Sequence, residues 1–137
     1  MANYRMPKGA ADNIVFVLTI FILFLLVFEG RLVIPTWLQP IGRMHPLLLH
    51  FPIVIILLAM ALEFFRFTTR SDASKKIYED LTRYFLLAGI FLTGVTVIMG
   101  IFLSKEAAYN ADSLFSHKWT GVAVYFLSAI IYRCRNY

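Results

Sequence analysis

The sequence predicts an all-α protein, a bundle of four transmembrane helices, and three observations support this fold class. Of the 137 residues, 60% are hydrophobic and 15% are charged, and the mean hydropathy of +0.73 is far above that of a soluble domain. Four windows approach the length of about 20 apolar residues that a spanning helix needs. The connections between them are short, so we expect a single domain over residues 1–137.

The four expected helices cover about residues 13–34, 46–67, 80–104 and 114–133. Only Glu29 and Arg31 interrupt the first apolar window. That window is long and no small-residue cleavage motif follows it, so we interpret it as a retained anchor and not as a cleaved signal peptide. The segment that comes next contains prolines and a glycine, which predict a turn before the second helix.

The remaining three helices differ in where they carry polar residues. The second has His50 near its start, and the third has no charged residue between positions 84 and 103. Asp80 is the expected cap of the third helix because an aspartate side chain can accept hydrogen bonds from the first free N–H groups. The fourth helix carries His117 and Lys118 in its first turn.

The net charge of +5 indicates membrane topology and not a nucleic-acid partner, because the basic residues divide unevenly between the two sides of the predicted bundle. Four lie on the side of the loops before the second and fourth helices: Arg31, Arg43, Lys105 and Lys118. Nine lie on the other side: Arg5, Lys8, Arg66, Arg70, Lys75, Lys76, Arg83, Arg133 and Arg135. The positive-inside rule then predicts a multi-pass protein of the bacterial inner (cytoplasmic) membrane with both termini in the cytoplasm.

Several kinds of chemistry find no support in the sequence. Cys134 is the single cysteine, so no disulfide can form within the chain, and no C-x-x-C-H motif for covalent haem exists. Nucleophile elbows, phosphate loops and paired catalytic carboxylates are also missing. These observations leave open whether the protein is an enzyme.

Three histidines are the most informative polar residues in this apolar chain. His45 and His50 lie at the start of the second helix, and His117 lies at the start of the fourth. Because these two helices run in the same direction, we expect all three side chains at the same membrane face. Ionisable groups inside membrane helices usually mark a functional site, and imidazoles are frequent ligands of metals and haem.

The predicted site holds one haem b with His50 and His117 as its axial ligands. His45 and His50 are five positions apart, roughly 140° around a helix, so they do not face the same way. His45 precedes Pro46 and is expected at the rim of the helix, whereas His50 lies inside it and can point into the bundle. A helix bundle with neutral imidazoles is a usual haem site.

Other residues near these histidines complete the expected site. Gly121 lies one turn after His117 and would let a flat macrocycle approach the backbone. Arg43, Lys118 or His45 would meet the haem propionates. Glycines in the third helix, Gly94 and Gly100, could serve the same purpose or allow close helix packing, which is the commoner role.

Two other interpretations of the histidines remain open. A copper site could use all three together with Met44, since imidazole and soft sulfur ligands suit copper. The histidines could instead cap helices and pair with Glu29 or Asp112. For Glu29 itself, an ion pair with Arg31 or Arg43 is favoured over a role as proton acceptor from a quinol.

The segment from Gly42 to Ile53 resembles the G-R-x-H-P-L-x-x-H-F-P opening of a bacterial family of small membrane domains. Residues 116–121, Ser-His-Lys-Trp-Thr-Gly, are similar to that family's second signature, H-x-W-x-G. Such domains often stand alone or precede a periplasmic c-type cytochrome domain. The resemblance implies a four-helix fold, membrane redox chemistry, and roles for His45, His50 and His117. This chain has no cytochrome domain, so a covalent haem, if one is involved, is expected on a partner.

Two functions therefore compete. The first is a redox subunit of the respiratory chain that holds haem b near the periplasmic face and passes electrons between the quinol pool and a c-type cytochrome. The second is a non-catalytic accessory subunit of a larger membrane complex. The chain has 13 Phe, 7 Tyr and 2 Trp, and this aromatic content fits the extensive contact with lipid or helices that either function requires.

Overall fold

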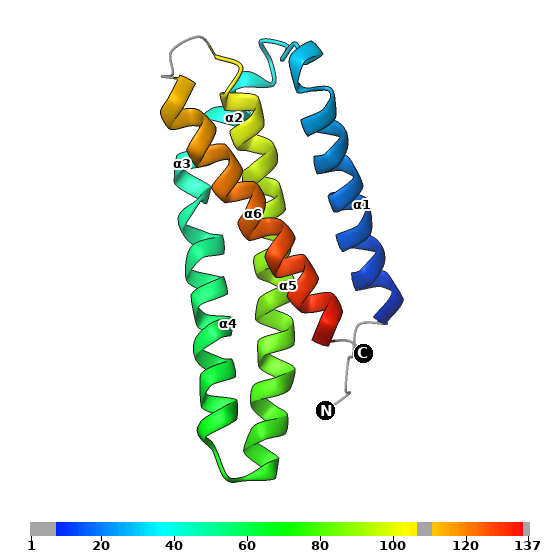
Figure 1. Cartoon of the computed structure of the whole chain (residues 1–137), viewed down its shortest axis with the longest axis vertical. Helices are drawn as coiled ribbons and strands as arrows, with labels where there is room; N and C mark the ends of the chain where they lie inside the picture. Colours follow the sequence, from blue (N-terminus) through cyan, green and yellow to red (C-terminus); the bar gives the residue numbers. More distant parts are fainter. Residues whose placement is uncertain (1–7, 107–110, 136–137) are drawn as a thin grey trace.

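The computed structural model describes residues 8–106 and 111–135, and it confirms an all-α bundle of four helices that are long and apolar enough to span a membrane (Figure 1). In chain order the elements are α1 (Lys8–Val27), the short 3₁₀ helix η1 (Glu29–Arg31), α2 (Gln39–Arg43), α3 (His45–Leu48), α4 (His50–Thr68), α5 (Asp72–Leu103) and α6 (Ala111–Arg135). The short α2 and α3 lead directly into α4, and together they form one continuous apolar span over Gln39–Thr68.

Helix α5 lies at the centre of the bundle, and α1, α4 and α6 each pack against it (Figure 1). Its buried residues include Ile90 and Ile101, which are almost completely enclosed. It also buries Thr93 and Thr96, whose hydroxyls donate to the carbonyls of Gly89 and Leu92 one turn earlier. Because these hydroxyls are satisfied within their own helix, α5 can be buried on several sides despite its polar residues.

Glycines on α5 allow three of its neighbours, α1, α4 and α6, to approach closely. A Cβ atom at Gly94 would lie 2.9 Å from Cγ of Leu18 on α1 and 3.0 Å from Cε2 of Tyr125 on α6. A Cβ at Gly89 would lie 2.8 Å from Cγ1 of Ile56 on α4. Small residues at such contacts are typical of membrane helices, which associate through packing because lipid offers no hydrophobic driving force. The packing role expected for Gly94 is therefore confirmed.

The helix boundaries differ from the predicted ones at several positions. Helix α1 ends at Val27 and not near residue 34, because the chain forms η1 before the proline-containing turn. Helix α5 begins at Asp72, where the Ser71 hydroxyl accepts a hydrogen bond from the Ser74 N–H at 3.4 Å. The expected cap, Asp80, thus lies inside the helix. With 32 residues, α5 is about 48 Å long and exceeds the ~30 Å hydrocarbon core.

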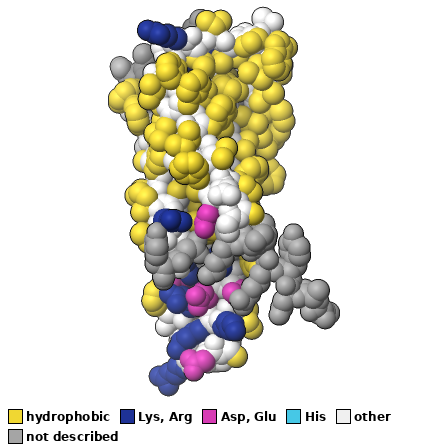
Figure 2. Space-filling model, turned by 90° about the vertical axis from the view of Figure 1, so that its right-hand side faces the viewer, with side chains coloured by type: hydrophobic (Ala, Val, Ile, Leu, Met, Phe, Trp, Pro, Cys, Tyr) yellow, Lys and Arg dark blue, Asp and Glu magenta, His cyan; other side chains and the backbone are white. Residues whose placement is uncertain are grey.

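The α4–α5 turn forms one end of the bundle, and the start of α1 and the end of α6 lie in the same half of the molecule, nearer its middle (Figure 1). We call this half the hairpin end. In Figure 2, hydrophobic side chains dominate the upper part of the visible face, with a basic side chain at its upper edge, and Lys, Arg, Asp and Glu cluster toward its lower end. The opposite end, here the histidine end, carries η1, α2, α3, the end of α5 and the start of α6. Apart from Arg5, which lies outside the described residues, the two groups of basic residues thus lie toward opposite ends of a multi-pass protein, and the cytoplasmic placement of the hairpin end stays a prediction.

Cysteine labelling of intact cells tests this orientation. In a Cys134→Ser background, we expect Thr36→Cys at the histidine end to react with a membrane-impermeant maleimide, because it would face the periplasm. Lys76→Cys at the hairpin end should react only after the membrane is permeabilised. Both side chains are exposed in the structure, so burial does not protect them. Labelling of Lys76→Cys alone in intact cells would reverse the predicted topology.

Candidate functional site

A cleft of about 920 Å³ lies between α4 and α6 at the histidine end, with α5 as its floor. We call it the α4–α6 cleft. It exists because α4 and α6 both pack against α5 but not closely against each other. Most of its lining is apolar, including Ile53, Ile56, Val97 and Val124. An apolar cleft of this size with few polar groups is typical of a small-molecule or cofactor site.

His45 is a polar side chain of the cleft wall, and the backbone of α5 holds its ring. Its Nδ1 lies 2.8 Å from the backbone oxygen of Thr96 on α5. A carbonyl oxygen can only accept, so Nδ1 carries the proton and donates, which leaves Nε2 as an acceptor with a free lone pair. Nε2 is buried and has no hydrogen-bond partner in the described part of the chain. The ring is therefore oriented by the backbone of α5 and offers an unused ligand atom.

Gly100 provides the space for this ring. A Cβ atom at Gly100 would lie 3.1 Å from Cε1 and 3.3 Å from Nδ1 of His45. The ring can therefore lie directly on the backbone of α5, one turn beyond the carbonyl that it contacts. His45 is the first residue of α3, and Pro46 follows it in the first turn, where a missing N–H costs no hydrogen bond.

His117 on α6 faces His45 across the cleft. The centres of the two rings are 5.8 Å apart and their planes are nearly perpendicular, at 86°. Both residues line the cleft, and His117 is the more exposed of the two. Two imidazoles from different helices thus meet at the same place, as the sequence predicted for the second and fourth spans.

The second-helix histidine that meets His117 is nevertheless His45, and not His50. His50 begins α4, is exposed, and is not part of the cleft wall. The physical reason is the angular separation of the two residues: when one of them faces α5 and α6, the other faces away. We had expected the proline after His45 to leave it at the rim, but α3 turns this residue toward α5.

The other predicted site residues divide into two groups. Lys118 and Gly121 line the cleft beside His117. A Cβ at Gly121 would meet only a methyl of Val97, at 3.9 Å, so the backbone of α6 is open to the cleft there. Arg43 lies outside the cleft wall and forms an exposed ion pair with Glu106, with its Nε 3.1 Å from the carboxylate.

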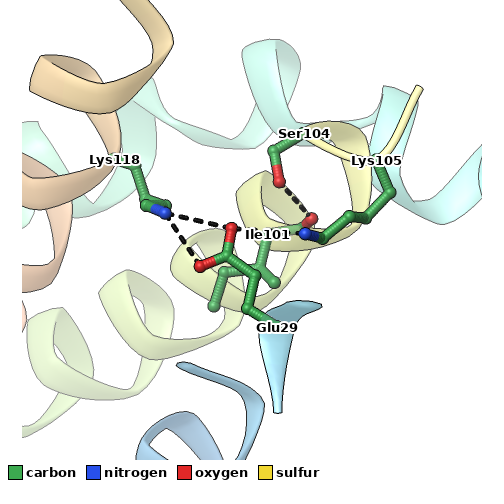
Figure 3. A network of polar contacts seen from close by, with 5 residues as sticks. All are labelled: Glu29, Ile101, Ser104, Lys105 and Lys118. Carbon is green, nitrogen blue, oxygen red and sulfur yellow. Dashed lines mark hydrogen bonds and ion pairs between the residues drawn. The ribbon is translucent and has the colours of Figure 1, made fainter. Parts of the chain in front are cut away.

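Glu29, Lys105 and Lys118 form an ion-pair network at the histidine end, beside the cleft (Figure 3). The Glu29 carboxylate on η1 accepts hydrogen bonds from Lys118 Nζ at 2.8 and 3.0 Å and from Lys105 Nζ at 3.4 Å. Burial raises the pKa of the Glu29 carboxyl, but hydrogen bonds and charges from Lys118 and Lys105 lower it by more, so its pKa lies below its usual value. The expected pairing of Glu29 with Arg31 or Arg43 is therefore replaced by a pairing with two lysines.

The copper interpretation requires three histidines and Met44 around one point. Among the described residues, no group of three or more His, Cys, Asp and Glu side chains could hold a metal ion. Met44 is 46% exposed. The side chain of Asp112, proposed above as a partner of a histidine, lies outside the described part of the structure. What the cleft offers is a pair of imidazoles from two different helices.

Thr96 and Gly100 orient the His45 ring; Thr96 was not assigned to the site from the sequence, and Gly100 was named there only as a glycine that could face a macrocycle or allow helix packing. The sequence signal that could have identified both residues is their spacing of four on the third helix, which places them one turn apart on the same helix face. Comparisons with known protein families, with curated proteins and with solved structures found no match for this chain. The site is thus described by its residues and their geometry.

Proposed function

We propose that this protein binds haem b in the α4–α6 cleft through His45 and His117 and acts as an electron-transfer subunit in a bacterial membrane. The observation that carries the proposal is the buried Nε2 of His45, which has no partner although its ring lies 5.8 Å from that of His117. A buried acceptor without a partner costs about 1–3 kcal/mol, so this atom needs an explanation, and a bound metal ion or water would supply one.

The spacing of the two rings is close to that of two imidazoles that share a metal ion. A metal–imidazole nitrogen bond is about 2.0–2.1 Å long, which places the centres of two imidazoles on opposite sides of one ion roughly 6.4 Å apart. The observed 5.8 Å is shorter than this by about half an ångström, so the two rings would separate slightly to hold an ion between them. The mainly apolar walls of the cleft suit a macrocycle, and its 920 Å³ lies within the usual range of about 300–1,000 Å³ for such sites.

The chain's own residues would prepare this site in three ways. The Thr96 carbonyl holds the His45 N–H and so fixes the tautomer and direction of the ligand, as outer-shell partners do in metal sites. Gly100 leaves room for the ring, and the apolar walls exclude water. The haem iron, when bound, would supply one-electron transfer.

The proposed partners are a membrane quinol and a periplasmic c-type cytochrome. They are inferred from the resemblance of residues 42–53 and 116–121 to a family whose members adjoin cytochrome domains. Four candidate membrane spans give the protein the lipid contact that a quinol partner requires. The histidine end, where the cleft lies, would face the periplasm in the predicted topology.

An optical spectrum of the purified protein tests the proposal. Protein isolated in detergent from haem-replete cells should show a Soret band, reducible α and β bands, and a b-type pyridine haemochrome in a ratio of about one haem per chain. Colourless protein from the same cells would contradict the proposal and favour the non-catalytic accessory subunit. Metal analysis of the same sample would detect a non-haem metal in its place.

A further inference from the structure

We infer that the ligand of the α4–α6 cleft is an acidic amphiphile, with an apolar body between α4 and α6 and a carboxylate received by Lys118 and Lys105. This inference rests on the proposed function and deepens it by assigning the groups that recognise the ligand's charge. Its basis is the ion-pair network of Glu29, Lys105 and Lys118 beside the cleft (Figure 3).

The network contains more positive than negative charge. Two ammonium groups share the single carboxylate of Glu29, with Nζ–O distances of 2.8 Å for Lys118 and 3.4 Å for Lys105. The low pKa of Glu29 keeps that carboxylate charged at neutral pH, so the three groups together carry one unit of positive charge. The nearby pair of Arg43 and Glu106 is neutral as a whole and does not change this balance.

This charge is only partly exposed to solvent. The side chains of Lys118, Glu29 and Lys105 are 18%, 21% and 24% exposed, respectively. An excess charge in such a place is weakly screened and attracts an anion more strongly than a surface lysine does. Because Lys118 and Ser104, the residue before Lys105, both line the cleft, this attraction acts at the cleft itself.

The arrangement also explains how the network can accept a second carboxylate without rebuilding the fold. The longer contact, from Lys105, is the weaker of the two that Glu29 accepts. An incoming carboxylate can bind Lys105 and share Lys118 while Glu29 keeps its shorter contact. Lysine suits this role because its ammonium has three donors and can serve two acceptors at once.

A charge series in this network, read out by ligand binding, tests the inference. Apoprotein in detergent is titrated with haemin, which has two free propionates, and with haemin dimethyl ester, which has none. The measured quantity is the ratio of the Kd for the ester to the Kd for haemin. We expect the wild-type protein to prefer haemin by about tenfold, which is the effect of one weakly screened charge.

The variants change the charge of the network in both directions. Lys118→Met and Lys105→Met each leave Glu29 with one lysine and no excess charge, and both should bring the ratio near one. Glu29→Gln frees both lysines and should raise the ratio about tenfold further. Lys75→Met is the matched control, because Lys75 pairs with Asp72 at the hairpin end, far from the cleft along α5. Its ratio should equal that of the wild type.

The outcomes separate this inference from the proposed function. Wild-type protein that binds haemin and the ester equally well, with a ratio unaffected by the three network variants, overturns the inference alone. Wild-type protein that binds neither compound overturns the proposed function and the inference together. Should Glu29→Gln fail to fold, the two lysine variants still decide the question, because each leaves the Glu29 carboxylate paired.

Discussion

Replacement of either cleft histidine by alanine, His45→Ala or His117→Ala, should abolish the low-spin b-type spectrum, whereas His50→Ala should leave it unchanged. Each cleft variant removes one of the two imidazoles whose centres are 5.8 Å apart, and nothing else in the described cleft wall offers a comparable nitrogen ligand. His50 is exposed and lies outside the wall, so its loss removes no ligand. The measurement is the haem-to-protein ratio of the purified variants by pyridine haemochrome.

Two controls make this experiment decisive. The helix content and gel-filtration profile of all three variants should match those of the wild type, because none of the three histidines belongs to the buried core. Added imidazole should restore a Soret band to His117→Ala, since the exposed position of His117 gives a small ligand access. Retention of haem by His45→Ala with its loss in His50→Ala would instead support the pair His50 and His117 that the sequence suggested.

The second large effect is on stability, at the contact between α5 and α1. Gly94→Ala should destabilise the bundle by about 1–3 kcal/mol, the usual cost of overpacking a close contact. The new methyl would lie against the Leu18 side chain, 2.9 Å from its Cγ, and 3.0 Å from Cε2 of Tyr125. Because Tyr125 is fully buried and hydrogen-bonded to Thr19 at 2.9 Å, it has little room to move.

Thermal unfolding in detergent, followed by circular dichroism, measures this effect. Gly121→Ala is the matched control, because its methyl would meet only Val97, at 3.9 Å, and should leave the melting temperature unchanged. The double variant with Leu18→Ala should recover part of the stability lost in Gly94→Ala, since it empties the space into which the methyl points. Equal melting temperatures for Gly94→Ala and Gly121→Ala would show that the α1–α5 contact is looser than the structure indicates.

The fold could be predicted from the sequence because lipid imposes a simple rule. A chain that crosses a membrane must satisfy its backbone hydrogen bonds internally, so four apolar windows separated by short polar turns imply four helices. The ends of those helices were less predictable. The charged turns at the start of α5 look like a loop by composition, yet Ser71 caps a helix that begins well before the apolar window.

The sequence predicted the residue types of the candidate site and the end of the bundle where it lies, but not which histidines pair. The order of the spans fixes their directions, and this places all three histidines at the same end of the bundle. Which of His45 and His50 faces α6 depends on how α3 rotates on the backbone of α5, and that rotation is set by Gly100 and the Thr96 carbonyl. These contacts join residues about fifty positions apart, and no local pattern reports them.

The central position of α5 also constrains how the protein is made. Since α1 and α4 pack mainly on α5 and not on each other, neither has its main packing partner while the ribosome is still translating the first 71 residues. Helices α1 and α4 therefore remain in the bilayer as separate inserted segments, which is the first stage of membrane protein assembly. Emergence of α5 then lets them assemble, and α6, which brings His117, docks last. The cleft, and with it any capacity to take up a cofactor, therefore arises only after α6 has been synthesised.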